Sequence, residues 1–144
     1  MDSFYHGWFT GWMQGMAELS CRERTKVFRQ CGKACAQPEM LPRYQRLLQA
    51  AADADGFFDA VNREVDGVDV QTVTRGSEYD LYYPQCYCPL HVEGGVNDGM
   101  LCECSRESLL WLMGELFPER KPTVELLASV LRGDARCCLR VRLH

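Results

Sequence analysis

Apolar residues recur at helical spacing near the start of the chain. They stand four residues apart at Phe4, Trp8, Trp12 and Met16. This period predicts a helix over residues 4–18 with a wide apolar face. Three glycines, Gly7, Gly11 and Gly15, repeat at the same interval and leave a groove without side chains. We therefore expect this helix to pack closely against the domain's own core or against a twin subunit, which makes a homodimer a candidate assembly.

Three further helices are predicted before residue 66. Ser20 and Glu23 have the spacing of a capping box, so a helix should begin at Ser20 and end at Pro38. Its apolar face includes Cys31 and Cys35, one turn apart. A third helix should run from residue 39 or 42 to about 52, and a fourth over residues 56–64.

After Gly67 the spacing of apolar residues changes from the helical pattern to every second residue, which is typical of β-strands. Residues 68–73 and 78–83 alternate as two strands around a turn, and residues 123–131 and 137–143 are predicted as an antiparallel pair around Gly133. Ser105 should cap a helix between these pairs. This order predicts an α+β fold with N-terminal helices packed on a mainly antiparallel sheet and one helix between strands. We expect one domain over residues 1–144, with a mainly helical half (1–66) and a strand-rich, cysteine-bearing half (67–144).

Composition and charge exclude several classes of protein. The 144 residues are 47% hydrophobic and 25% charged, as in a globular domain. The net charge of -4 does not favour binding to nucleic acid or to an anionic membrane surface. No segment has the length of a bilayer span, and the first eight residues lack the pattern of a signal peptide. A cytoplasmic location is therefore expected. In that reducing compartment, the nine cysteines should be thiols or metal ligands rather than disulfides.

Two Cys-x-Cys pairs are the main candidate site. In an extended backbone both thiols of a pair point to one side, so Cys86, Cys88, Cys102 and Cys104 could bind one tetrahedral zinc ion. His91 stands three residues after Cys88 and is a further candidate ligand. The other secondary candidates for the metal are Cys31, Cys35 and Cys137.

Cys104 is the best candidate for a reactive thiolate. A helix beginning at Ser105, followed by Arg106, would lower the pKa of this thiol if no metal were bound. A second hypothesis is therefore a metal-free thiol redox protein, or a redox or ligand sensor, that uses the Cys-x-Cys pairs as reversible disulfides. A third is a structural or partner-binding module with inert, buried cysteines, which is the role we expect for Cys21 and Cys138.

Aromatic residues crowd the approach to the first pair. They are Tyr79, Tyr82, Tyr83 and Tyr87. Tyrosines on strands usually serve packing, yet these could also wall a pocket whose polar ligand their hydroxyls orient. The sequence contains no Ser-His-Asp order, phosphate loop or dinucleotide fingerprint.

Four segments together resemble a family of small bacterial proteins, some of which are labelled L-2-amino-thiazoline-4-carboxylic acid hydrolase. The segments are residues 28–36, 86–90, 101–105 and 124–137. The resemblance covers about residues 20–143. The closing strand pair, with Arg132-Gly133-Asp134 before Cys137, also resembles the small-ligand-binding domain named after 4-vinyl reductase.

The resemblance implies an α+β fold that can hold zinc through cysteines. It matches seven cysteines to positions that recur in the family: Cys31, Cys35, Cys86, Cys88, Cys102, Cys104 and Cys137. Its label implies hydrolysis of a C–N or C–S bond in a small sulfur-containing or heterocyclic compound. An active metal would need an open coordination position, whereas a closed four-cysteine site would be structural and the domain would bind or sense a ligand.

Overall fold

The computed structural model describes residues 3–144, so Met1 and Asp2 of the segment tested for a signal peptide lie outside it. Four helices come first: α1 (Ser3–Ala17), α2 (Cys21–Ala36), α3 (Met40–Ala50) and α4 (Ala54–Glu64). Strands β1 (Asp69–Thr74) and β2 (Glu78–Tyr83) follow, then α5 (Pro89–Val92) and α6 (Leu101–Leu116). The chain ends with η1 (Pro118–Arg120), β3 (Thr123–Ala128), η2 (Val130–Arg132) and β4 (Cys137–Arg142).

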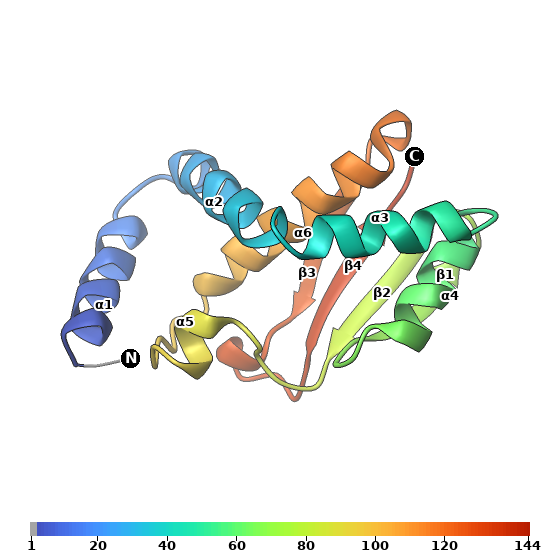
Figure 1. Ribbon diagram of the computed structural model, residues 1–144. Helices are drawn as coiled ribbons and strands as arrows, with labels where there is room; N and C mark the ends of the chain where they lie inside the picture. Colours follow the sequence, from blue (N-terminus) through green and yellow to red (C-terminus); the bar gives the residue numbers. More distant parts are fainter. Residues whose placement is uncertain (1–2) are drawn as a thin grey trace.

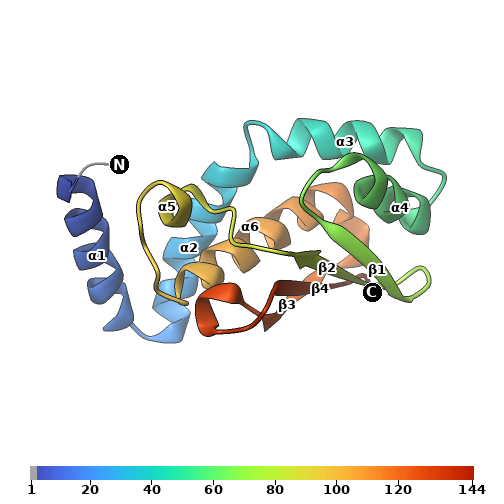
Figure 2. The same cartoon turned by 90° about the horizontal axis from the view of Figure 1, so that it is seen from below.

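The four strands form one antiparallel sheet in the order β1-β2-β4-β3. Helices α3, α4 and α6 lie against one face of this sheet (Figures 1 and 2). The predicted α+β class is confirmed, and β2 matches the predicted strand. The short α5 lies in a segment for which the sequence predicted no helix.

An aromatic core joins the helices to the sheet. The ring of Phe58 stacks on Tyr79 of β2 with centroids 3.9 Å apart, and Phe57 meets Phe117 edge-on at 5.4 Å. Within the sheet, Leu81 of β2 lies opposite Leu139 of β4. All six side chains are almost completely buried. Successive side chains of β2 point to opposite faces of the sheet, so its apolar side chains lie toward the helices.

The second face of the sheet carries an ion pair. Arg140 of β4 donates two hydrogen bonds to the carboxylate of Asp80 on β2, at 2.7 and 2.9 Å. Asp80 is only 4% exposed, so this bidentate pair compensates for a buried carboxylate between neighbouring strands.

Helix α2 begins and packs as its sequence predicts. Ser20 Oγ accepts a hydrogen bond from Glu23 N at 3.1 Å, and Glu23 Oε1 accepts one from Ser20 N at 3.3 Å, which confirms the capping box. Arg24 then pairs with Glu103 of α6 at 3.0 Å. Further along, Gly32 of α2 lies against the backbone of Ser108. The two helices therefore pack against each other, and they cross in the view of Figure 1.

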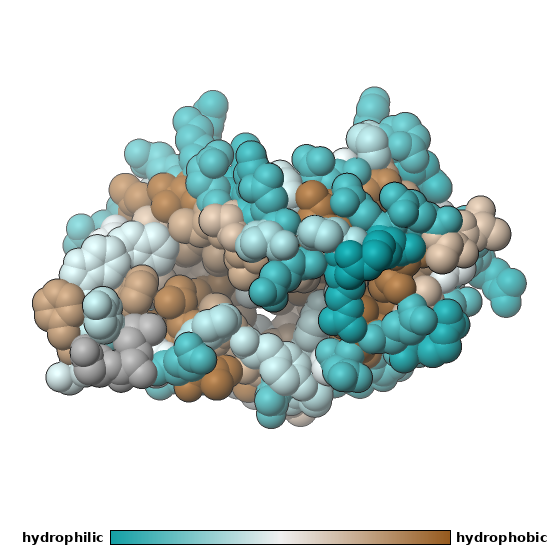
Figure 3. Space-filling model, viewed as in Figure 1, coloured by the Kyte–Doolittle hydropathy of each residue, from teal (hydrophilic) through white to brown (hydrophobic). Residues whose placement is uncertain are grey.

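Helix α1 differs from its prediction. It lies at one end of the molecule, and only Met13 and Met16 on it are buried (Figure 1). Phe4 is 69% and Trp8 is 55% exposed, and the surface over α1 at the left of Figure 3 is mostly brown and pale. No atom lies within 4 Å of a Cβ built at Gly7, Gly11 or Gly15 among the described residues. The domain's own core therefore does not cover the glycine groove, and packing against a twin subunit stays a prediction.

None of the helices between residues 3 and 144 is long and apolar enough to cross a membrane.

Candidate thiol site and adjoining pocket

The second Cys-x-Cys pair lies inside a helix. Helix α6 begins at Leu101, four residues before the predicted cap at Ser105. Asp98 explains the earlier start, because its carboxylate accepts from Met100 N at 2.9 Å and its carbonyl accepts from Leu101 N at 3.0 Å. The expectation of an extended second pair was therefore wrong. Residues two apart on a helix are separated by roughly 200° around its axis, so Cys102 and Cys104 face different neighbours.

Cys102 faces the end of the sheet. It is buried, and its Sγ lies 2.9 Å from Ser129 Oγ, with either atom able to donate. The next residue, Val130, donates its backbone N–H to Cys137 Sγ at 3.4 Å. The Ser129 segment therefore brings the thiols of Cys102 and Cys137 to the same place.

Cys104 faces helix α2. Burial, together with the smaller effects of the nearby Cys31, Cys88, Cys35 and Glu107, raises the pKa of Cys104 to about 12. We expected the helix start to lower this pKa, but the helix begins too early for Cys104 to precede it. In the metal-free protein Cys104 is therefore a protonated thiol at neutral pH.

The first Cys-x-Cys pair lies in the segment between β2 and α5, outside helices and strands. Cys88 has extended backbone angles, as predicted for this pair. Burial raises the pKa of Cys88 although the backbone N–H groups of Leu90 and His91 lower it. The charge of Cys88 also acts on Cys86, Cys102 and Cys104. Cys88 is thus central among the thiols.

Seven cysteines are connected by electrostatic interactions between neighbouring thiols, and we call them the cysteine cluster. They are Cys31, Cys35, Cys86, Cys88, Cys102, Cys104 and Cys137. They come from α2, the segment before α5, α6 and β4. The other two, exposed Cys21 and buried Cys138, do not belong to it, and all nine are free thiols.

The cysteine cluster is not arranged as a ready coordination sphere. Among residues 3–144, no three His, Cys, Asp or Glu side chains lie in positions that could hold a metal ion. The four thiols expected to share a zinc ion are therefore near one another but not converged. His91 hydrogen-bonds through Nδ1 to Val96 O at 2.9 Å, so only its Nε2 is available to a metal.

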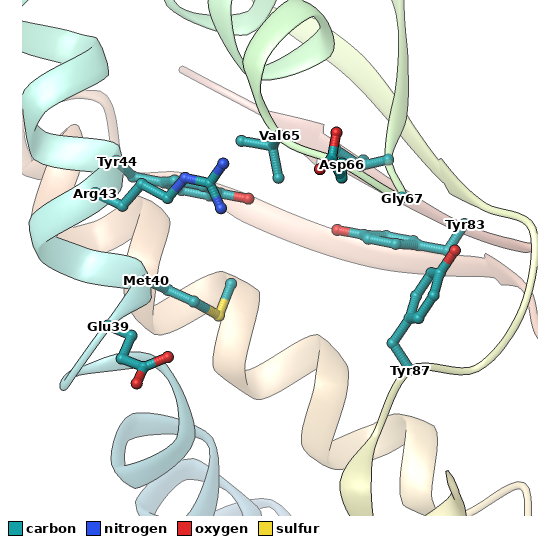
Figure 4. A pocket seen from close by; sticks show the side chains of 10 residues that line it. Glu39, Met40, Arg43, Tyr44, Val65, Asp66, Gly67, Tyr83 and Tyr87 are labelled. Carbon is teal, nitrogen blue, oxygen red and sulfur yellow. The ribbon is translucent and has the colours of Figure 1, made fainter.

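A pocket adjoins the cluster through Tyr87, the residue between Cys86 and Cys88. Its volume is about 310 Å³. Its walls come from α3, the segment after α4, and the end of β2 (Figure 4): Glu39, Met40, Arg43, Tyr44, Val65, Asp66, Gly67, Val68, Tyr83 and Tyr87. Gly67 has φ of 83°, and a Cβ there would lie 3.1 Å from Tyr87 Cζ, so glycine permits the close approach of this ring.

Two tyrosine hydroxyls and a guanidinium supply the pocket's polar groups. In Figure 4 the hydroxyls of Tyr44 and Tyr83 point toward one another, and Arg43 lies beside Tyr44. Burial raises the pKa of both Tyr44 and Tyr83 above the usual value of a phenol. Both hydroxyls therefore stay neutral and can donate hydrogen bonds to an anion.

The other two tyrosines considered from the sequence serve packing. Tyr79 lies in the core, where its hydroxyl donates to Asp55 at 2.5 Å. Tyr82 lies beneath Arg136, whose guanidinium carbon is 3.7 Å from the ring centroid.

Three contributors to the site were not recognised in the sequence. Ser129 contacts Cys102, Tyr44 lines the pocket, and Glu107 lies near Cys104. Glu107 follows Cys104 by three residues, a spacing that shares a helix face and could have revealed it. Ser129 and Tyr44 gave no such local signal.

Comparison with known proteins gives a likeness of fold. No protein-family model and no curated protein matches this chain. A solved structure, trafficking protein particle complex subunit 3 from Naegleria fowleri covalently bound to palmitic acid, superposes with a TM-score of 0.55. The match covers 98% of this chain and 92% of that one at 12% sequence identity. At this identity the likeness shows that the two chains share a fold.

Proposed function

We propose that this chain is a small-ligand-binding domain in which a soft divalent metal, with zinc the first candidate, binds the cysteine cluster beside the pocket. One observation carries the proposal. Tyr87 forms a wall of the pocket, and the residues on either side of it are cluster thiols, Cys86 and Cys88. Ligand site and thiol site are thus parts of one segment.

The chemistry of the donor set supports the metal. Thiolates are soft ligands that select zinc and related ions. When several neighbouring thiols ionise, they repel one another, and this repulsion contributes to the raised pKa of Cys86, Cys102 and Cys104. A divalent cation relieves that repulsion while each bound thiol releases its proton to solvent. Rotation of cysteine side chains about χ1 would be needed to converge the sulfurs.

An open coordination position would allow catalysis. A bound zinc ion with only three protein ligands supplies Lewis-acid activation of water. Hydrolysis of a C–N or C–S bond is the matching reaction, and the pocket beside Tyr87 would hold the substrate. With a fourth thiolate bound, the domain would bind or sense the ligand without turnover. The free state of all nine cysteines suits a reducing compartment such as the cytoplasm.

The pocket favours a ligand that has a carboxylate and an apolar or ring-shaped body. Arg43 can pair with the carboxylate, and the neutral hydroxyls of Tyr44 and Tyr83 can donate to it. The ring of Tyr87 offers a face for stacking. L-2-amino-thiazoline-4-carboxylate combines these features. Palmitate, which the similar solved structure holds covalently, also combines a carboxyl group with an apolar body.

Removal of one cluster thiol should reduce metal binding. We expect protein purified without an affinity metal to contain at least one zinc ion per chain, with metal-bound cluster thiols that react only after chelation. Cys102→Ser should weaken zinc binding by about tenfold or more, because an alcohol does not replace a thiolate ligand. Elemental analysis and thiol titration under denaturation measure both quantities.

Cys21→Ser is the matched control for this experiment, since Cys21 is exposed and outside the cluster. Its zinc content should equal that of the natural protein. A sample without metal, in which fewer than nine thiols titrate until reductant is added, would replace the metal proposal with the redox alternative.

Loss of the Tyr83 hydroxyl should weaken ligand binding. We expect L-2-amino-thiazoline-4-carboxylate or palmitate to raise the melting temperature of the natural protein. Tyr83→Phe should raise the dissociation constant roughly tenfold, because a hydrogen bond to a charged group contributes about 1.5–3 kcal/mol. Tyr82→Phe, on the second face of the sheet, is the control and should bind normally. Equal weakening in both variants, or no stabilisation by either compound, would contradict the assignment of this pocket.

A further inference from the structure

The pocket beside Tyr87 contains a buried tyrosine whose hydroxyl has no partner. Tyr44 is only 5% exposed, and its side chain makes no hydrogen bond to any residue between 3 and 144. Its hydroxyl points into the pocket, toward that of Tyr83 (Figure 4). Buried polar groups in native proteins almost always have a hydrogen-bond partner. A polar atom of a bound ligand would supply the one that Tyr44 lacks.

Three charged side chains line the same pocket, and two of them are carboxylates. They are Glu39, Arg43 and Asp66, and all three residues are exposed. The buried Tyr44 therefore lies at the floor of the pocket, and the charges lie at its rim. In Figure 4, Arg43 and Glu39 come from the side of α3, and Asp66 comes from the segment after α4.

The charges at the rim do not neutralise one another. Arg43 Nη2 donates a hydrogen bond to the backbone carbonyl of Glu64 at 2.9 Å, which holds the guanidinium in place. Glu39 stands at the N-cap of α3, yet its side chain accepts no capping hydrogen bond. Among the described residues, neither Glu39 nor Asp66 belongs to an ion pair. Both carboxylates are therefore available to a ligand.

This balance of charge disfavours a ligand that is only an anion. Its carboxylate would be attracted by Arg43 and repelled by Glu39 and Asp66, because charges near a protein surface still act over several ångströms. A cationic nitrogen in the same ligand would be attracted by both carboxylates. The rim therefore favours a compound that has both charges.

We infer that the pocket binds a small zwitterion, in which a cationic nitrogen pairs with Glu39 and Asp66 while the carboxylate faces Arg43 and the tyrosine hydroxyls. The apolar body then lies against Met40 and the ring of Tyr87. The inference rests on the proposed function, because it concerns the same pocket, and it adds the second charge and the two residues that select it.

Two probes that differ only in an amine test the inference. L-Phenylalanine has both charges and an apolar ring, and 3-phenylpropionate has the same skeleton without the amine. Each exposed ion pair changes affinity by up to about fivefold. We expect calorimetric titration to show that L-phenylalanine binds about tenfold more tightly. The preference should shrink as salt is raised, because added ions screen the rim charges.

Asp66→Asn removes one rim charge with little change of shape. It should weaken binding of L-phenylalanine about threefold and leave binding of 3-phenylpropionate unchanged or tighter. The double variant Glu39→Gln with Asp66→Asn should lose most of the preference. Asp59→Asn, an exposed change on α4 outside the pocket, is the control with the same change of net charge and should behave like the natural protein. A variant that merely damaged the pocket would weaken both probes.

The possible results separate this inference from the proposed function. Equal or tighter binding of 3-phenylpropionate by the natural protein would overturn the inference and leave a carboxylate pocket standing. An Asp66→Asn variant that weakens both probes equally would also overturn it. So would failure of L-phenylalanine to bind while either compound named under the proposed function binds. If none of the four compounds binds, the proposed ligand site itself is wrong.

Discussion

Replacing Gly32 with alanine should destabilise the protein by about 1–3 kcal/mol, the usual cost of overpacking a well-packed contact. The new Cβ would lie 2.5 Å from Ser108 N and 2.8 Å from Ser108 Cα. Both atoms belong to the backbone, so a side-chain rotation cannot relieve the clash and α2 must move away from α6. Alanine's better helix propensity offsets only about 0.5–1 kcal/mol of this cost. Chemical denaturation of the metal-free protein measures the difference.

Gly114→Ala is the matched control because Gly114 also lies in a helix, near the C-terminal end of α6. A Cβ there meets no atom within 4 Å among the described residues. This variant should be more stable than the natural protein by up to about 1 kcal/mol. If the two variants had the same stability, the close approach of α2 and α6 at Gly32 would be wrong.

Replacing Phe57 with alanine should cost more, about 3–5 kcal/mol. Its ring is completely buried and meets the rings of Phe58 at 5.0 Å, Phe117 at 5.4 Å and Tyr44 at 6.2 Å, all edge-on. Truncation would leave a cavity at the junction of α3, α4 and the end of α6. The free energy of unfolding in urea or guanidinium reports the loss.

Phe57→Leu serves as the comparison because it retains most of the buried volume. Its cost should stay below about 1.5 kcal/mol, provided that the core repacks. Equal losses in both variants would indicate that the ring contacts, rather than the filled volume, dominate this part of the core. A loss below about 1 kcal/mol for Phe57→Ala would contradict its burial.

Local patterns were sufficient for most elements of the fold. The capping box at Ser20 and Glu23 and the alternation of residues 78–83 each depend on interactions within a few residues, and both were predicted. The pairing of β2 with β4 depends on segments almost sixty residues apart, such as Leu81 and Leu139, and no local pattern specifies it. The exposure of Phe4 could not be predicted from the spacing of apolar residues. That spacing identifies an apolar face of a helix but not which part of the protein covers it.

The candidate site was predicted by composition more than by geometry. The seven cysteines of the cluster are the seven singled out by resemblance, but among residues 3–144 no three metal-ligating side chains lie where they could hold an ion. The predicted grouping into two extended pairs did not anticipate that Asp98 starts α6 before Cys102. The early start places Cys102 and Cys104 within the helix, so their thiols face different neighbours. Glu107 was missed because its burial depends on Gly32, from a distant helix.

The position of Tyr87 has a thermodynamic consequence. Because this ring stands between two cluster thiols and also forms the pocket wall, any metal that repositions the segment alters the affinity of the pocket for its ligand. Linkage then requires the ligand to change the affinity for that metal by the same factor. Metal supply and ligand supply would in that case act on the domain as reciprocal effectors, through one tripeptide and without movement of the sheet.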